Sequence, residues 1–143
     1  MSRLRAGEWI AGGGGIALLA VMFAGWYSGA SAWEAFDVLD VVLALLALVP
    51  LALVTLQATR ISPSLPVAFS VLTTVGGALA TLLILYRIIN QPGPNDAVDV
   101  DLGAWLGLAA AAVAAAGGWR SMRVEAIPGA LIAPVEDLPA PAP

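Results

Sequence analysis

Residues 41–56 read VVLALLALVPLALVTL, sixteen consecutive positions without a charged side chain. They belong to a longer stretch that carries no charge between Asp40 and Arg60. A helix needs about 20 apolar residues, each rising about 1.5 Å, to cross a hydrocarbon layer about 30 Å thick. This stretch is therefore long enough to span a membrane, and it favours an all-α membrane protein.

Three more segments have this character, so the sequence predicts spans at about 8–27, 38–59, 65–89 and 101–119. The short connections between them favour antiparallel neighbours. We therefore expect residues 1–123 to form a four-helix transmembrane bundle of up-down-up-down topology. The last segment, 124–143, contains five prolines and is expected to be a flexible cytoplasmic tail. Only 11% of the chain is charged, against about 25% in soluble domains, which supports lipid as its surroundings.

The arginines predict the orientation of these spans. Five of the six basic residues fall on one side of a four-span topology: Arg3, Arg5, Arg60, Arg120 and Arg123. Positive residues favour the cytoplasmic side, so both termini of this multi-pass protein are expected in the cytoplasm. Tryptophans favour the membrane–water interfaces. The expected anchors are Trp9 and Trp119 on the inner side, and Trp26, Trp33 and Trp105 on the outer side.

Acidic residues gather on the predicted outer side. Ser31 and Glu34 have the spacing of a capping box, so a helix should begin near Ala32 and continue into the second span. On such a helix Glu34, Asp37 and Asp40 would form one polar stripe. The whole expected acidic rim comprises Glu34, Asp37, Asp40, Asp96, Asp99 and Asp101. It is either an ordinary solvated helix end or a site for cations or a basic partner.

Arg87 is the single basic residue on that side. Its side chain could extend to the lipid headgroups. It could also form a salt bridge with the acidic stripe and so hold the third predicted helix against the second.

Small residues recur every four positions in the last two predicted spans. They are Gly103, Gly107, Ala111 and Ala115 in one, and Thr73, Gly77 and Thr81 in the other. Small side chains let helix backbones approach closely in lipid. The contact could lie within one chain, with a second copy or with another membrane protein. Two more features affect packing: a run of four glycines at 12–15, and Pro50 within the second span, where a kink is expected.

The first span has a second interpretation. Arg3 and Arg5, the apolar core and then Ala30-Ser31-Ala32 resemble a secretory signal with its cleavage site. The mature chain would then retain three spans.

The chain lacks the groups that most membrane chemistry uses. It has no histidine and no cysteine, the usual ligands of haem iron and catalytic zinc. We find no ionisable residue between the predicted interfaces, whereas ion-coupled transporters keep such groups near mid-membrane. We therefore expect no catalytic residue, cofactor or metal, and the lipid bilayer rather than nucleic acid as the surroundings.

Several stretches carry a resemblance to known proteins: WYSGASAWEAFDVLD, LQATRISPSLPVAFSVLTTV, LILYRIINQPG and LGAWLGLAAAAVAAAGGWRSMR. In this order they resemble small four-span membrane proteins of actinobacteria and related high-GC bacteria, over about residues 1–123. That family has no assigned function, so the resemblance implies a topology and a source and no active site.

Two functions follow as hypotheses. The first is a non-catalytic accessory or assembly subunit of a membrane complex. The alternative is a small oligomeric cation-selective pore, in which the acidic rim concentrates cations and Thr73, Thr74 and Thr81 line the path.

Overall fold

The computed structural model describes residues 4–59, 64–94 and 96–125, with the side chains of residues 64–67 and 125 outside this description. In chain order the elements are α1 (Ala6–Val21), β1 (Gly25–Tyr27), β2 (Ala30–Ser31), α2 (Ala32–Ala35), α3 (Leu39–Thr59), α4 (Ser64–Ile89) and α5 (Leu102–Glu125). The structure is 77% helical, which confirms the predicted helical class. Arg3, Arg60 and nearly all of the predicted tail lie outside the described residues.

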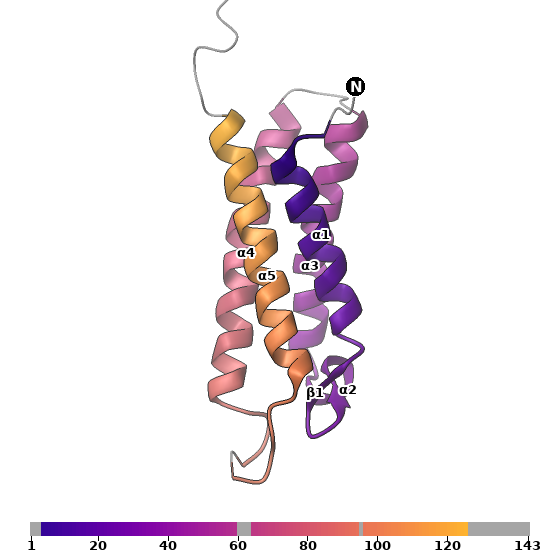
Figure 1. Ribbon diagram of the computed structural model, residues 1–143, viewed down its shortest axis with the longest axis vertical. Helices are drawn as coiled ribbons and strands as arrows, with labels where there is room; N and C mark the ends of the chain where they lie inside the picture. The colour runs from indigo at the N-terminus through magenta and orange to yellow at the C-terminus, as the bar shows by residue number, and fades with distance from the viewer. Residues whose placement is uncertain (1–3, 60–63, 95, 126–143) are drawn as a thin grey trace, which may run out of the picture.

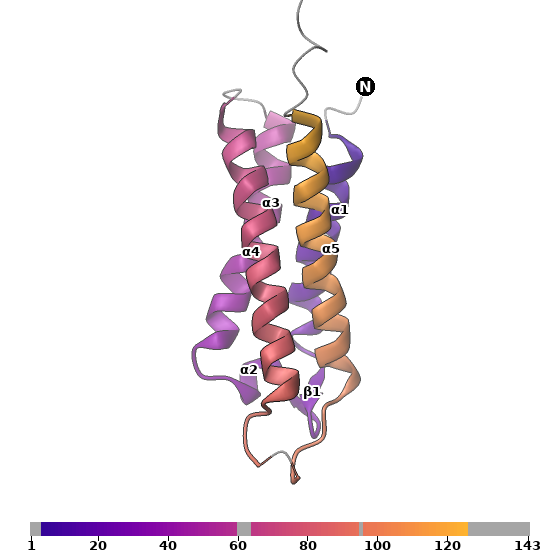
Figure 2. The ribbon, with the colours of Figure 1, turned by 90° about the vertical axis from the view of Figure 1, so that its left-hand side faces the viewer.

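The four long helices lie side by side, and each runs antiparallel to the next one along the chain (Figure 1). α1 packs against α3 and α5, and α4 packs against the same two helices, so the four form a closed ring. The start of α1 and the end of α5 lie at the same end of the molecule (Figure 2). We call this the arginine end, after Arg5, Arg120 and Arg123, and the opposite one the hairpin end, after β1 and β2.

Three helices are long and apolar enough to cross a membrane: α3, residues Ala68–Ile89 of α4, and residues Leu102–Val124 of α5. Their bounds agree with the predicted spans at most ends, although α5 continues six residues beyond position 119. α1 is shorter, with 16 residues, and at about 1.5 Å per residue it extends about 24 Å.

The first predicted span is wrong at its C-terminal end, because α1 ends at Val21 and not near Tyr27. The reason is a tight turn just beyond it. Ser28 and Gly29 both have positive φ, 47° and 85°, as a type I′ turn requires, and this turn favours a two-residue hairpin. Residues 25–27 must be extended to pair with residues 30–31 across the turn, so the helix has to end before them.

The second predicted span also differs at its start. The capping box of Ser31 and Glu34 is present, and α2 begins at Ala32 as predicted. However, Phe36 adopts an extended conformation with φ −126° and ψ 146°, so the helix stops after one turn. α3 begins again at Leu39. Glu34, Asp37 and Asp40 therefore do not form a stripe on one continuous helix.

Large apolar side chains are exposed around the outside of the bundle at mid-height. Leu45 is 60% exposed, Leu82 63% and Val113 45%. Several polar side chains face the interior instead: Glu8, Gln57, Ser70, Thr73 and Ser121. The core is still mostly apolar, with Leu18, Leu43 and Ile84 among its members, so large apolar side chains occur on the outside of the bundle as well as in its core.

Glycines bring α1 into backbone contact with both of its neighbours. A Cβ atom added to Gly14 would lie 2.5 Å from the amide nitrogen of Ala114 in α5. A Cβ atom on Gly117 would collide with the backbone of Ala11. On the α3 side, a Cβ atom on Gly15 would lie 2.7 Å from both the Pro50 ring and the Ala47 carbonyl oxygen. Glycines of the run 12–15 therefore allow close packing on two faces of α1. Helix α3 continues through Pro50 at the point where α1 approaches it.

We expect Gly14→Ala to destabilise the protein by about 1–3 kcal/mol, because the new methyl group would meet backbone atoms that have no freedom to turn aside. Gly13→Ala is the matched control, since a Cβ atom there would have nothing within 4 Å. Thermal unfolding in one detergent, followed by circular dichroism, compares the two. Equal unfolding temperatures for both variants would contradict the packing described here.

Candidate functional site

The acidic residues of the predicted rim all belong to the hairpin end, but they have different surroundings. Glu34, Asp37, Asp96 and Asp99 are exposed, Asp101 is half-buried and Asp40 is only 8% exposed. Within the described residues, no group of three or more acidic side chains is arranged so that it could hold a metal ion. The rim is therefore not one converging site in this structure.

Three of these carboxylates have bonds to backbone amides. Glu34 accepts the Ser31 N–H at 2.9 Å and the Ser31 hydroxyl at 2.8 Å. The backbone bond, and then the hydroxyl bond, lower the pKa of Glu34 below its usual value. Asp101 accepts the Gly29 N–H at 2.6 Å, and Asp40 accepts the Val41 N–H at 2.7 Å. These acids stabilise turns and a helix start.

The hairpin is joined to the segment that precedes α5. The Ser28 N–H donates to the Asp99 carbonyl at 3.0 Å, and the Asp99 N–H donates to the Ser28 hydroxyl at 3.1 Å. The Asp101 N–H donates to the Trp26 carbonyl at 2.8 Å. These bonds join residues more than 70 positions apart in the chain and close the hairpin end of the bundle.

Trp26 is the centre of this end. Its side chain is 0% exposed, and its indole N–H donates at 2.7 Å to the Val21 carbonyl at the end of α1, which also accepts the Ala24 N–H at 2.9 Å. The ring fills a slot that α5 leaves open: a Cβ atom on Gly107 would lie 2.5 Å from the ring, and one on Gly103 2.8 Å from it. The prediction that Trp26 anchors the chain at the interface is therefore wrong, because the glycines of α5 give the indole a place inside the protein.

The other predicted anchors are more accessible. Trp9 is 61% exposed, Trp105 50% and Trp119 51%. Trp33 is half-buried beside Phe23, with 5.7 Å between the ring centroids. Trp9 and Trp119 belong to the arginine end, and Trp105 is in the first turn of α5 at the hairpin end.

Arg87 reaches the aromatic residues of the hairpin end. Its guanidinium carbon lies 5.0 Å from the centroid of the Phe36 ring, a cation–π geometry. Among the described residues Arg87 makes no salt bridge to the acidic stripe, and its Nε atom is buried without a hydrogen-bond partner. The Tyr27 ring packs edge-on against Phe36 at 5.7 Å.

The small residues predicted to mediate packing contact other helices of the same chain. A Cβ atom on Gly77 of α4 would lie 2.7 Å from the backbone of Ala115 in α5. Thr73 is buried against Gly118, and Ala111 is fully buried. The Thr81 hydroxyl donates to the Gly77 carbonyl of its own helix at 2.7 Å. Gly103 and Gly107 hold Trp26, as described above.

The arginine end also contains a buried polar layer that was not predicted from the sequence. Glu8 is 1% exposed, and its carboxylate accepts the Arg5 backbone N–H and, at 3.4 Å, the Ser121 hydroxyl. The Ser70 hydroxyl donates to Ser121 at 3.3 Å. The layer thus links α1, α5 and α4. A signal for it exists in the sequence, because Glu8 lies on the same helical face as Ala11, Gly15 and Leu18, which are all buried.

This arrangement offers little for catalysis. Glu8, Ser70 and Ser121 are each at most 2% exposed, so a substrate could not reach the carboxylate–hydroxyl chain. Its hydrogen bonds satisfy polar groups within the bundle, and we interpret it as structural.

Comparison of the chain with protein-family models, with curated proteins and with solved structures gave no match. The functional argument therefore depends on the geometry of the molecule.

Trp26→Phe should destabilise the fold by about 1–3 kcal/mol, because it removes the bond to the Val21 carbonyl and leaves part of the glycine slot empty. Trp33→Phe is the matched control, because the indole N–H of Trp33 has no hydrogen-bond partner among the described residues. Thermal unfolding in detergent measures both. If Trp33→Phe lowered the stability of the fold as much as Trp26→Phe does, Trp26 would contribute no more than Trp33 to closing the hairpin end.

Proposed function

We propose that this chain is a multi-pass protein of the bacterial cytoplasmic membrane, in which all four long helices cross the bilayer and both termini face the cytoplasm. The observation that carries this proposal is the distribution of side chains. Between its two ends the outer surface carries many exposed large apolar side chains, among them Leu45, Leu82 and Val113, and soluble monomers rarely expose so many. In lipid the same surface is solvated.

The short first helix is compatible with a fourth span. α1 covers about 24 Å of the roughly 30 Å required. Just beyond it the N–H groups of Met22, Phe23 and Ala24 donate to carbonyls of α1, and the exposed side chain of Phe23 is apolar. Met22 and Trp26 are 0% exposed and Tyr27 is 3% exposed. Non-helical backbone is tolerated at membrane depth where the protein itself covers it, so the segment after Val21 can complete the crossing.

The first helix also has many contacts with the rest of the molecule, which supports its retention. α1 packs extensively against α5. Ala32, at the end of the signal-like Ala-Ser-Ala segment, is fully buried and donates its N–H to the Met22 carbonyl at 3.1 Å. Removal of the chain before this point would expose the glycine-rich face of α5.

We further propose that the protein is a non-catalytic accessory or assembly subunit of a membrane complex. The buried polar groups are engaged in packing and in turns, and the described residues offer no accessible nucleophile–base pair. The small faces of α4 and α5 are used inside the monomer. A partner would therefore meet the outer apolar surface of the bundle.

The alternative, an oligomeric cation pore, finds less support. Thr73 is buried between α4 and α5, and the hydroxyls of Thr74 and Thr81 donate to carbonyls of their own helix. In the described part of the chain, these threonines do not line a common path.

Topology and partner can be tested on the same tagged strain. Reporters fused to each end, one active only in the cytoplasm and one only outside it, should both report a cytoplasmic location. A gentle-detergent pull-down should recover a larger membrane protein in fixed ratio, and purified protein in liposomes should conduct no ions. Termini on opposite sides would contradict the four-span topology, and cation flux or recovery of the chain alone would contradict the accessory role.

A further inference from the structure

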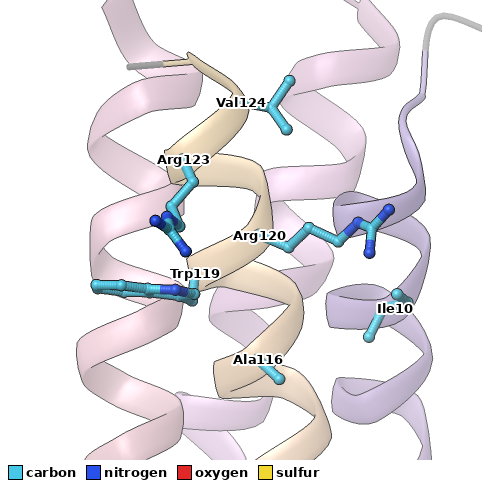
Figure 3. Close-up of a pocket in the computed structure, with 6 residues that line it drawn as sticks. All are labelled: Ile10, Ala116, Trp119, Arg120, Arg123 and Val124. Carbon is cyan, nitrogen blue, oxygen red and sulfur yellow. The ribbon is translucent and has the colours of Figure 1, made fainter. Parts of the chain in front are cut away.

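An open groove lies between α1 and α5 at the arginine end of the bundle (Figure 3). It is lined by Ile10, Ala116, Trp119, Arg120, Arg123 and Val124. Arg120 extends from α5 across towards α1, where Ile10 lies, and Ala116 lies on the other side of Arg120 from Val124 (Figure 3). Charged and apolar side chains thus face the same concave surface.

The groove is positively charged at one end and apolar at the other. Arg120 and Arg123 are both exposed and three positions apart on α5. Figure 3 shows Arg120 directed towards α1 and Arg123 directed to the other side of α5, over the Trp119 ring, so the two flank the concave surface. Ala116 is one turn, about 6 Å, nearer the middle of the bundle, at the level where apolar side chains dominate the surface. A molecule that fits both parts needs an anionic head and an apolar body, in that order.

The two guanidinium groups are available for an anion. The guanidinium carbon of Arg123 lies 5.8 Å from the centroid of the Trp119 ring, which holds the group at the interface level without using its N–H donors. Neither Arg120 nor Arg123 forms a hydrogen bond or salt bridge to any other residue that the structure describes. Guanidinium groups bind phosphate oxygens in paired geometry.

We infer that this groove binds one anionic phospholipid, with its headgroup between Arg120 and Arg123, its phosphate on the Arg120 side, and its acyl chains along Ala116 and Ile10. The inference depends on the proposed membrane location, because only there does a phospholipid surround the helices. It goes beyond general attraction of arginines to an anionic surface, since Arg5 has the same charge at the same end and does not line the groove.

The test is a titration of the full chain, in mild detergent, with phosphatidylglycerol or phosphatidylcholine that carry the same acyl chains. Native mass spectrometry counts the bound lipid. We expect a preference for phosphatidylglycerol. The double variant Arg120→Gln/Arg123→Gln should weaken phosphatidylglycerol binding by about fivefold per arginine, or about 25-fold in total, and should weaken phosphatidylcholine binding less, because choline offsets the charge of that phosphate.

Two further variants separate charge from shape. Arg5→Gln removes one charge from the same end and should leave the preference intact. Ala116→Phe fills the apolar part of the groove and should reduce binding of both lipids. Ala112→Phe is its control: this residue lies one turn nearer the hairpin end, does not line the groove, and its substitution should leave lipid binding unchanged. Circular dichroism checks each variant for folding, and Ala116→Phe still tests the site if the double arginine variant does not fold.

The inference is overturned if the parent chain binds both lipids equally, or if Arg5→Gln weakens phosphatidylglycerol binding as much as the double variant does. Reconstitution distinguishes this failure from a failure of the proposed location. A chain that inserts into liposomes without lipid preference contradicts only the lipid site, whereas a chain that stays soluble without detergent contradicts the membrane proposal itself.

Discussion

Close backbone contact between helices is the constraint on which this structure depends. In lipid, apolar side chains gain nothing by moving from solvent to a helix interface, so helices must hold together by tight packing and by buried hydrogen bonds. Gly14 and Gly117 meet the neighbouring backbone directly, and Glu8 and Ser121 add a polar link at one end of the same pair of helices. The α1–α5 contact thus combines both kinds of attraction that remain when water is absent.

The hairpin end closes the bundle beyond the end of the short helix α1. The carbonyl of Val21, the last residue of α1, accepts both the Ala24 N–H and the N–H of the fully buried Trp26 indole, and the same indole fills the slot in α5. The turn at Ser28 and Gly29 returns the chain so that it can begin α2 and α3. Trp26 therefore connects a helix end, a hairpin and a glycine face, and the aromatic residues Tyr27 and Phe36 extend this cluster to Arg87.

The length of the uncharged stretches predicted the helices well, and the surroundings of individual side chains explain where that prediction failed. The bounds of α3 and α4 follow the predicted spans closely, because an uncharged stretch of this length has few alternatives to a helix. The end of α1 was missed because residues 22–29 are uncharged, as the helix before them is after Glu8, and only the turn geometry at Ser28-Gly29 reveals the hairpin. The capping box at Ser31 was predicted correctly, but the break at Phe36 depends on the ring packing against residues distant in sequence.

The candidate site was only partly within reach of sequence reasoning. The location of the acids at one end follows from their positions between helices, but Asp101 and Asp40 bond to backbone groups that no spacing rule identifies. Aromatic content predicted exposed rings for Trp9, Trp105 and Trp119, and the same rule misplaced Trp26, because the glycines that hold it lie some 80 residues later. The burial of Glu8 has a signal in α1, because Glu8 shares a helical face with Ala11 and Leu18, but its bond to Ser121 of α5 could not be predicted from α1 alone.

The central claim, that lipid surrounds the middle of this bundle, is tested most directly by spin labels at single cysteines. The chain has no cysteine of its own, so Leu45→Cys, Leu82→Cys and Val113→Cys can be labelled one at a time in liposomes and compared with Asp37→Cys. The account predicts that molecular oxygen relaxes the three mid-height labels while a water-soluble nickel chelate does not reach them, and that the label at position 37 behaves in the opposite way. Equal access of the nickel chelate to all four positions would contradict it.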